Sequence, residues 1–272
     1  MRPGLRGLSV CLYSCDEALL TDLVWLLCTA FGVGTLIGAV GIGGILLIPA
    51  LTAFAHLPIH TAMATALFTF AFTGIAGTVM FQRRGSIDWS FTRPVLLGAT
   101  FFAFIGAWLN SQTGAGALAI LLASIIIFAG VYTLAAWQGM PRPALHGRGQ
   151  AQQILLVVLG AVAGFGSGLT GVGGPAISVP LMVMCGFPAL TAIGTSQVIQ
   201  IAAALSGTLG NLQYGTIDFG IAALLTLIEI AGVILGARIV HTVNADSLRK
   251  FVAMLCIAVG CVLIARELGW FH

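Results

Sequence analysis

Residues 41–49 read Gly-Ile-Gly-Gly-Ile-Leu-Leu-Ile-Pro, and residues 171–180 read Gly-Val-Gly-Gly-Pro-Ala-Ile-Ser-Val-Pro. The second stretch repeats the first at the offset that separates Gly171 from Gly41, and the closing prolines match with a slip of one position. Three further patterns recur at the same offset: Pro-x-x-Thr-Ala from Pro58 and Pro188, Gly-Thr from Gly77 and Gly207, and Gly-Ser/Thr-Ile-Asp ending at Asp88 and Asp218. Because repeats at a fixed period indicate a repeated structural unit, the chain is predicted to hold two copies of one unit.

The amino-acid composition indicates the environment, water or lipid, in which both copies fold. Of 272 residues, 59% are hydrophobic and 7% are charged, whereas about a quarter of the residues in an ordinary globular domain are charged. A soluble fold of this size needs more charge at its surface, so the partner of most of the chain is expected to be the lipid bilayer. The net charge of +3 comes with 11 scattered Lys and Arg residues, which argues against nucleic-acid binding.

Apolar segments define the expected architecture, since a spanning helix needs about 20 apolar residues. Five segments are predicted in each half, roughly at 19–40, 45–55, 59–81, 89–109 and 115–137, then at 153–170, 175–186, 188–212, 217–240 and 248–268. The fold class is therefore an all-α polytopic membrane protein. The repeats are expected at 19–137 and 153–268, joined by a cytoplasmic linker at 138–152, and the part before the first repeat is expected to form a short tail. The second segment of each half is too short to span freely, which predicts broken helices near the midplane.

Loop charges bear on the orientation of the two copies, because Lys and Arg favour the cytoplasmic side. If all ten segments cross and both termini face out, all eight internal Lys and Arg residues fall inside. They are Arg83, Arg84, Arg93, Arg142, Arg148, Arg238, Arg249 and Lys250. If the short segments do not cross, the copies are parallel and only five of the eight fall inside. The distribution favours inverted repeats, although the charges of the two tails oppose it.

The glycine stretches are the first candidates for substrate binding: Gly41, Gly43 and Gly44 in one copy, and Gly171, Gly173 and Gly174 in the other. Interrupted helices in repeated halves are typical of transporters with a substrate site at the midplane. A helix that begins after such a break presents free N–H groups and the positive end of its dipole, which suit an anion. The alternative is that these glycines only allow close helix packing.

Polar side chains of the third segment in each half are the second candidates. Thr61, Thr65, Thr69 and Thr73 recur every four residues, and the matching segment carries Thr191 and Thr195. The preferred substrate-binding members are Thr65, Thr195, Ser196, Gln197 and Gln200. Their hydroxyl and amide groups can line the path of an anion. They can equally bond to their own helix or hold helices together.

Glu229 lies about twelve residues into the segment 217–240, near the middle of a predicted span. A carboxylate at that depth is costly and indicates function, so it is a candidate for proton coupling. The alternative is a neutral structural acid. Asp88 and Asp218 each precede a helix and are expected to cap it. His56 and His60 are expected to have no carboxylate or Cys neighbours, and the six cysteines match no metal pattern. No metal site, cofactor or enzyme motif is therefore predicted.

Together, the Gly-rich break, the short helix ending at Pro49 or Pro180, the Pro-x-x-Thr-Ala entry and the Gly-Ser/Thr-Ile-Asp turn resemble the sulfite exporter TauE/SafE family. This family is also called the 4-toluene sulfonate uptake permease family. The resemblance covers about residues 20–268 and departs from symmetry at Ile45 against Pro175. It implies transport of a small sulfur-containing anion, such as sulfite, sulfoacetate or another organosulfonate, across a bacterial inner membrane, with export the commoner direction.

A secondary transporter working by alternating access is accordingly the expected function, with proton coupling through Glu229 as one option. An anion channel and a non-transporting membrane scaffold subunit are the alternatives. No oligomeric state follows from the sequence.

Overall fold

The computed structural model describes residues 4–41, 43–135, 149–187 and 189–239, together with 250, 254, 257–258, 260–262 and 264–265. Most of the expected linker and of the tenth segment therefore lie outside the described residues, as do Pro188 and the basic residues at 142, 148 and 249. The described part is helical and contains no strand.

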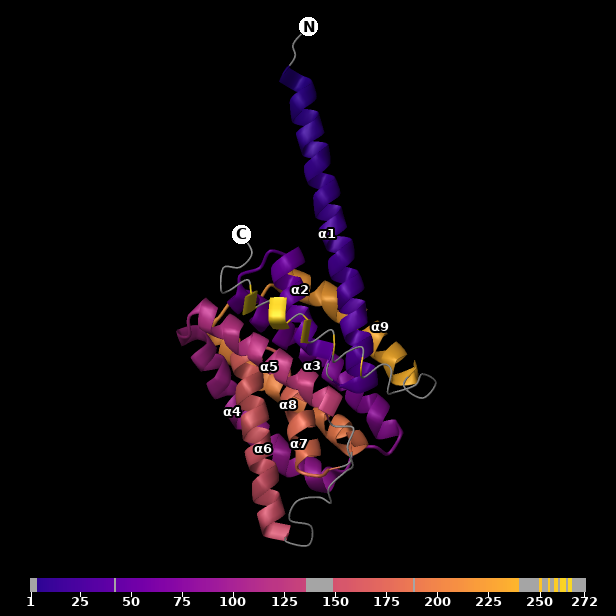
Figure 1. The fold of residues 1–272 in the computed structure, drawn as a ribbon, viewed down its shortest axis with the longest axis vertical. Coiled ribbons are helices and arrows are strands. Elements are labelled where there is room, and N and C mark those ends of the chain that lie inside the picture. The colour runs from indigo at the N-terminus through magenta and orange to yellow at the C-terminus, as the bar shows by residue number, and fades with distance from the viewer. Residues whose placement is uncertain are drawn as a thin grey trace.

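The helices follow the predicted order in both halves (Figure 1). The first half contains α1 (Gly4–Val40), the 3-10 helix η1 (Gly43–Leu46), α2 (Leu47–Phe54), α3 (Ile59–Arg83), α4 (Trp89–Gln112) and α5 (Ala115–Ala135). The second contains α6 (Gly149–Thr170), α7 (Pro175–Met184), α8 (Ala189–Tyr214) and α9 (Phe219–Ile239). The second element of each half is short, as predicted: η1 with α2 in one, and α7 in the other.

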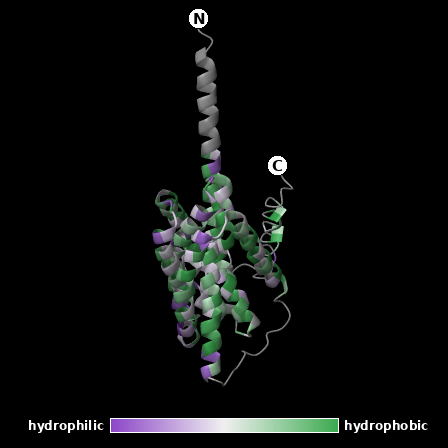
Figure 2. Ribbon diagram, turned by 90° about the vertical axis from the view of Figure 1, so that its left-hand side faces the viewer, coloured by the Kyte–Doolittle hydropathy of each residue, from purple (hydrophilic) through white to green (hydrophobic). Residues whose placement is uncertain are grey.

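Seven of the described helices are long and apolar enough to cross a membrane: Leu20–Ala39, Ile59–Arg83, Trp89–Gln112, Ala115–Tyr132, Gly149–Thr170, Thr191–Tyr214 and Phe219–Arg238. Their outer faces carry large apolar side chains, with Leu97 71% and Leu227 70% exposed. Figure 2 shows hydrophobic residues over most of the bundle. Because such surfaces are stable only in lipid, the prediction of a multi-pass α-helical membrane protein is confirmed.

The expected N-terminal tail is wrong in one respect. Helix α1 begins at Gly4 and runs for 37 residues without a break, and in Figure 1 its first part extends away from the other helices. No proline occurs between Pro3 and Pro49, so nothing in this stretch removes a helical hydrogen bond. Counting apolar residues locates the membrane-crossing part of a helix and not its end.

Corresponding helices of the two halves make corresponding contacts with the other half. Helix α1 packs on α9, and its counterpart α6 packs on α4; α4 also packs on α8, and its counterpart α9 packs on α3. Helices α3 and α8 cross each other between these pairs and are the most buried spans, at 61% and 72%. Reciprocal contacts of this kind are what a two-fold relation between the copies produces. The orientation of each copy across the membrane stays a prediction.

Glycines allow the helix backbones to approach closely at two interfaces, α1–α9 and α4–α6. A Cβ at Gly34 or Gly38 of α1 would overlap the backbone of α9 at Glu229 and Val233. At the equivalent positions of α6 in the second copy, Gly164 and Gly168 meet the backbone of α4 at Ala99 and Ala103. Small residues allow helix backbones in a membrane to approach this closely. The packing interpretation of the glycines therefore holds for these four.

We expect Gly34→Ala to destabilise the protein and Gly32→Ala, two positions earlier in α1, to leave it unchanged. The added methyl group at position 34 would displace the backbone of α9, whereas nothing lies within 4 Å of a Cβ at Gly32. Overpacking costs about 1–3 kcal/mol, and the control should stay within about 0.5 kcal/mol. Unfolding in detergent, followed by circular dichroism, measures both. Equal stabilities for the two variants would contradict the close α1–α9 contact.

Candidate functional site

Both helix breaks are formed by glycines in a backbone conformation that other residues resist. Gly41, after the end of α1, has φ +82°, and its counterpart Gly171, after the end of α6, has φ +67°. Gly173 has φ +87°. Left-handed backbone of this kind is strained for a residue with a Cβ. Pro175 then occupies the first turn of α7, where its missing N–H leaves no bond unmade.

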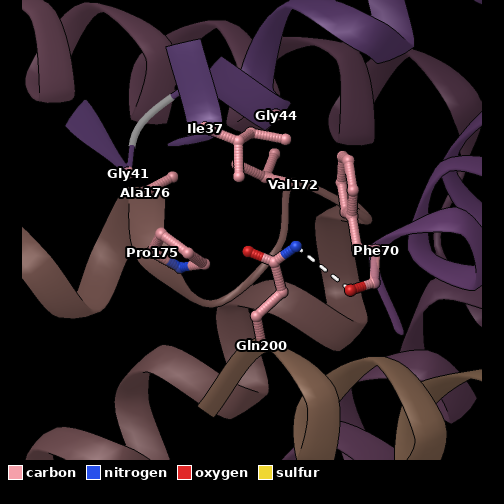
Figure 3. A pocket seen from close by; sticks show the side chains of 8 residues that line it. All are labelled: Ile37, Gly41, Gly44, Phe70, Val172, Pro175, Ala176 and Gln200. Carbon is pink, nitrogen blue, oxygen red and sulfur yellow. Dashed lines mark hydrogen bonds between the residues drawn. The ribbon is translucent and has the colours of Figure 1, made fainter. Parts of the chain in front are cut away.

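The two breaks converge on one narrow space at the centre of the bundle (Figure 3). Its walls come from both halves: Ile37, Gly41, Gly44 and Phe70 from the first, and Val172, Pro175, Ala176 and Gln200 from the second. The gaps between these atoms have no room for a water molecule. The structure thus brings the two breaks together, with Gly41 and Gly44 in the wall from the first break and Val172 and Pro175 from the second; Gly43, Gly171, Gly173 and Gly174 lie behind this wall.

Each break contacts the α3–α8 crossing in an equivalent way. A Cβ at Gly44 would lie 2.8 Å from Cζ of Phe70, and one at Gly174 would lie 3.2 Å from the backbone N of Gln200, the counterpart of Phe70 in the second copy. Further out, Gly41 faces Ile193 of α8, and its counterpart Gly171 meets the backbone of α3 at Met63. The space therefore lies between equivalent positions of the two copies.

Two backbone N–H groups of the second break have no hydrogen-bond partner among the described residues. These groups belong to Val172 and Gly173. They precede the N-terminus of α7, where the first N–H groups of a helix lack partners and the helix dipole is positive. Unpaired N–H groups before a helix are of the kind that stabilises an anion without a full positive charge.

Gln200 lines the space, although its donors are already used. Its Nε2 donates to the carbonyl oxygen of Phe70 at 3.1 Å and to Oγ1 of Thr73 at 2.9 Å. Because a carbonyl can only accept, these bonds fix the amide orientation, and Figure 3 shows Oε1 on the side of Pro175. In this conformation Gln200 holds α3 and α8 together and offers the space an acceptor.

The other predicted side chains lie around the space rather than on it. Oγ1 of Thr65 accepts from the backbone N of Asp218, at the start of α9. Its counterpart Thr195 bonds to Oγ1 of Thr92, near the start of α4. Both threonines thus join the central helices to the opposite copy, as the packing alternative expects.

Ser196 and Gln197 lie on α8 between Thr195 and Gln200. The Ser196 hydroxyl donates to the carbonyl of Ile193 at 2.7 Å and lies 3.8 Å from the position of a Cβ at Gly41. Gln197 is fully buried against Gly77, and neither its Oε1 nor its Nε2 has a partner among the described residues. Ser196 is therefore beside the first break, and Gln197 carries unused hydrogen-bonding groups in the protein interior.

Glu229 is fully buried in the middle of α9, and neither carboxyl oxygen has a hydrogen-bond partner among the described residues. The Thr69 side chain of α3 approaches the carboxyl group, but its hydroxyl donates to the carbonyl of Ala66 at 2.9 Å. On the facing turns, residues 29–40 of α1 and 62–80 of α3 contain no titratable side chain. A charged carboxylate without a partner in such surroundings is very unfavourable.

The predicted caps are confirmed, and one detail at the histidines is corrected. Oδ1 of Asp88 accepts from the backbone N of Ser90 at 2.9 Å, and Oδ1 of Asp218 accepts from that of Ile221 at 3.0 Å. His56 does have a carboxylate neighbour in space, since Asp22 of α1 lies 3.4 Å from its Nε2. In the described ranges no three His, Cys, Asp or Glu side chains gather as metal ligands.

Sequence reasoning missed Phe70, whose ring lies in the wall of the space. An aromatic residue in an apolar helix has no distinguishing pattern. The repeat itself held the only clue, because Phe70 occupies in α3 the position that the polar Gln200 occupies in α8.

Two repeated halves whose helix breaks meet in one space are typical of one class of protein, the multi-pass membrane transporters. The chain belongs to the sulfite exporter TauE/SafE family, whose model matches residues 26–263.

Similar curated proteins carry the same general description. The probable membrane transporter protein YdhB of Bacillus subtilis (strain 168) is 28% identical over 242 residues, covering 86% of this chain and 97% of that protein. The probable membrane transporter protein YunE of the same strain is 24% identical over 254 residues, covering 85% and 92%. No solved structure gives a significant match. The chain is therefore a membrane transporter protein by family and by relatives.

Proposed function

We propose that the chain is a secondary transporter that exports a small sulfur-containing anion, such as sulfite or an organosulfonate, across a bacterial inner membrane. The observation that carries this proposal is the convergence of both glycine breaks on one space, with unpaired N–H groups at Val172 and Gly173. The family points to sulfur oxyanions. The two repeats, 19–137 and 153–268, are proposed to be inverted, so that one site can face either side.

The anion is held by backbone amides of Gly43 and Gly44 on one side and of Gly173 and Gly174 on the other, with Gly41 and Gly171 setting the direction of each break. Ser196 and Gln200 complete the cage once Gln200 is released from its bonds to α3. Thr65, Thr195 and Gln197 lie along the path on either side. No Arg or Lys lies mid-span among the described helices, and a cage of neutral donors suits an anion that must also leave.

Alternating access follows from the closed space. With no room for water between the breaks, the present conformation is proposed to be an intermediate closed to both sides. Opening to either side moves α3 with its packed neighbours against α8, because these two helices carry the contacts of both breaks. Glu229, against α3, is proposed to bind a proton in one state and release it in the other, which drives the movement.

Sulfur anions are expected to stabilise the purified protein in detergent. A ligand that binds only the folded state adds about 2.7 kcal/mol at a hundred times its Kd. The measurement is the unfolding temperature in the presence of sulfite, sulfoacetate and 4-toluene sulfonate, with chloride at equal ionic strength as the control. No shift with any of these sulfur anions would contradict the proposed substrate class.

Transport itself is expected as saturable uptake of labelled sulfite into proteoliposomes, accelerated by unlabelled sulfite on the opposite side. Such counterflow requires one site that faces the two sides in turn. Flux that does not saturate would indicate a channel. The absence of flux, with ligand binding retained, would indicate a subunit that binds and does not transport.

A further inference from the structure

The ring of Phe70 is wedged between the two breaks. Its side chain is 1% exposed. A Cβ at Gly44 would lie 2.8 Å from Cζ of the ring, and a Cβ at Gly173 would lie 3.0 Å from Cδ2. A Cβ at either position would be closer to the ring than in nearly all real Cβ contacts, so glycine at both positions lets the ring pack this closely. One aromatic side chain thus touches the break of each half.

The ring also accounts for the lack of room in the space. Phe70 is the largest side chain in the wall (Figure 3), and the gap that it leaves does not admit water. At the equivalent position of the second copy, Gln200 presents an amide to the same space. The copies therefore differ at this pair: one offers a polar group, and the other an aromatic ring that fills volume.

We propose that Phe70 is the size gate of this site: its ring closes the space between the breaks, must withdraw to admit an anion, and by its volume limits which anions fit. The proposal rests on the proposed function in taking the space as the anion site. It assigns to a residue outside the hydrogen-bonding cage the selection between a small oxyanion and a bulky sulfonate. An apolar ring next to neutral N–H groups can select anions by size without adding charge to the site.

Gln200 holds the gate shut. Its Nε2 bonds to the carbonyl of Phe70 itself and to Thr73, so both donors fix the turn of α3 that carries the ring. In a close-packed interior a phenyl ring cannot leave its position unless its neighbours move. The ring therefore withdraws when this turn of α3 shifts against α8, which breaks both bonds and frees the Gln200 amide for the anion.

The first test compares Phe70→Ala and the milder Phe70→Leu with Phe187→Leu. Phe187 is also fully buried, and its ring packs on Phe91, outside the wall of the space. The measurement is uptake of labelled sulfite into proteoliposomes in competition with 4-toluene sulfonate. Trimming Phe70 should strengthen competition by the bulky anion by about tenfold or more, and Phe187→Leu should leave it unchanged. An unchanged ratio in both Phe70 variants, or an equal change in Phe187→Leu, overturns the proposal.

The second test does not depend on the substrate. Ala176, in the wall of the space, is replaced by Cys in a full-length chain whose six native cysteines are replaced by Ala. The measurement is the rate of modification by a small methanethiosulfonate reagent. Adding Phe70→Ala should raise this rate at least about tenfold, and adding Phe187→Leu should not. An unchanged rate overturns the gate even if sulfite is transported, whereas a raised rate without any sulfur-anion binding contradicts only the proposed function.

Discussion

Gly173→Ala is expected to reduce transport per folded molecule at least tenfold, which corresponds to about 1.4 kcal/mol. Two effects act together at this residue. A Cβ would place an L-residue at φ +87°, which costs about 1–2 kcal/mol. It would also lie 3.0 Å from Cδ2 of Phe70. The backbone that carries the unpaired N–H groups beside α7 would shift. Sulfite uptake, normalised to monodisperse protein, measures the effect.

The matched control is Gly85→Ala. Gly85 has φ +66°, in the turn between α3 and α4, and nothing lies within 4 Å of its Cβ position. The variant carries the same backbone strain without the contact, so it should lose about 1 kcal/mol of stability and keep its transport rate. If both variants transported at the same rate, position 173 would have no part in the site.

Glu229→Gln is expected to abolish the dependence of transport on a pH gradient while leaving sulfite counterflow in place. The amide keeps the size of the carboxyl group and carries no charge, so the fully buried position tolerates it. It cannot bind and release a proton, so a gradient no longer drives net movement. Uptake with and without an imposed pH gradient, compared with counterflow at equal pH, separates the two functions.

Thr226→Val serves as the control for this prediction. Thr226 is a buried polar residue of the same helix, and its hydroxyl donates to the carbonyl of Ala222, so its loss should leave gradient-driven uptake unchanged. Gradient-driven uptake that persists in Glu229→Gln would remove Glu229 from the coupling mechanism and leave it a structural acid.

The repeat made the fold and the position of the breaks predictable. Equal spacing of glycines in the two halves located Gly41 and Gly171, and the reciprocal contacts of the two halves bring both breaks to one space. The sequence repeat did not determine which residues of other helices contact the polar face of a given helix. The four-residue spacing of Thr65 and Thr69 correctly predicts one face of α3, but this face turns toward α9, where Thr65 contacts Asp218 and Thr69 approaches Glu229.

Pairings between the two copies depend on how α3 and α8 cross. A sequence pattern within one helix carries no information on that crossing. The bonds from Gln200 to Phe70 and Thr73 therefore could not be predicted from the sequence. The apolar wall of the space was hidden for the same reason, since Phe70 differs from other aromatic residues of α3 only in what lies opposite.

The close glycine contacts α1–α9 and α4–α6 have a consequence for the two halves as separate polypeptides. Gly34 and Gly38 are covered by α9, and Gly164 and Gly168 are covered by α4, so each copy buries its glycine faces only against the other. A single copy on its own would leave these faces uncovered. The two halves, encoded as separate polypeptides and synthesised together, should for the same reason reassemble through α1–α9 and α4–α6.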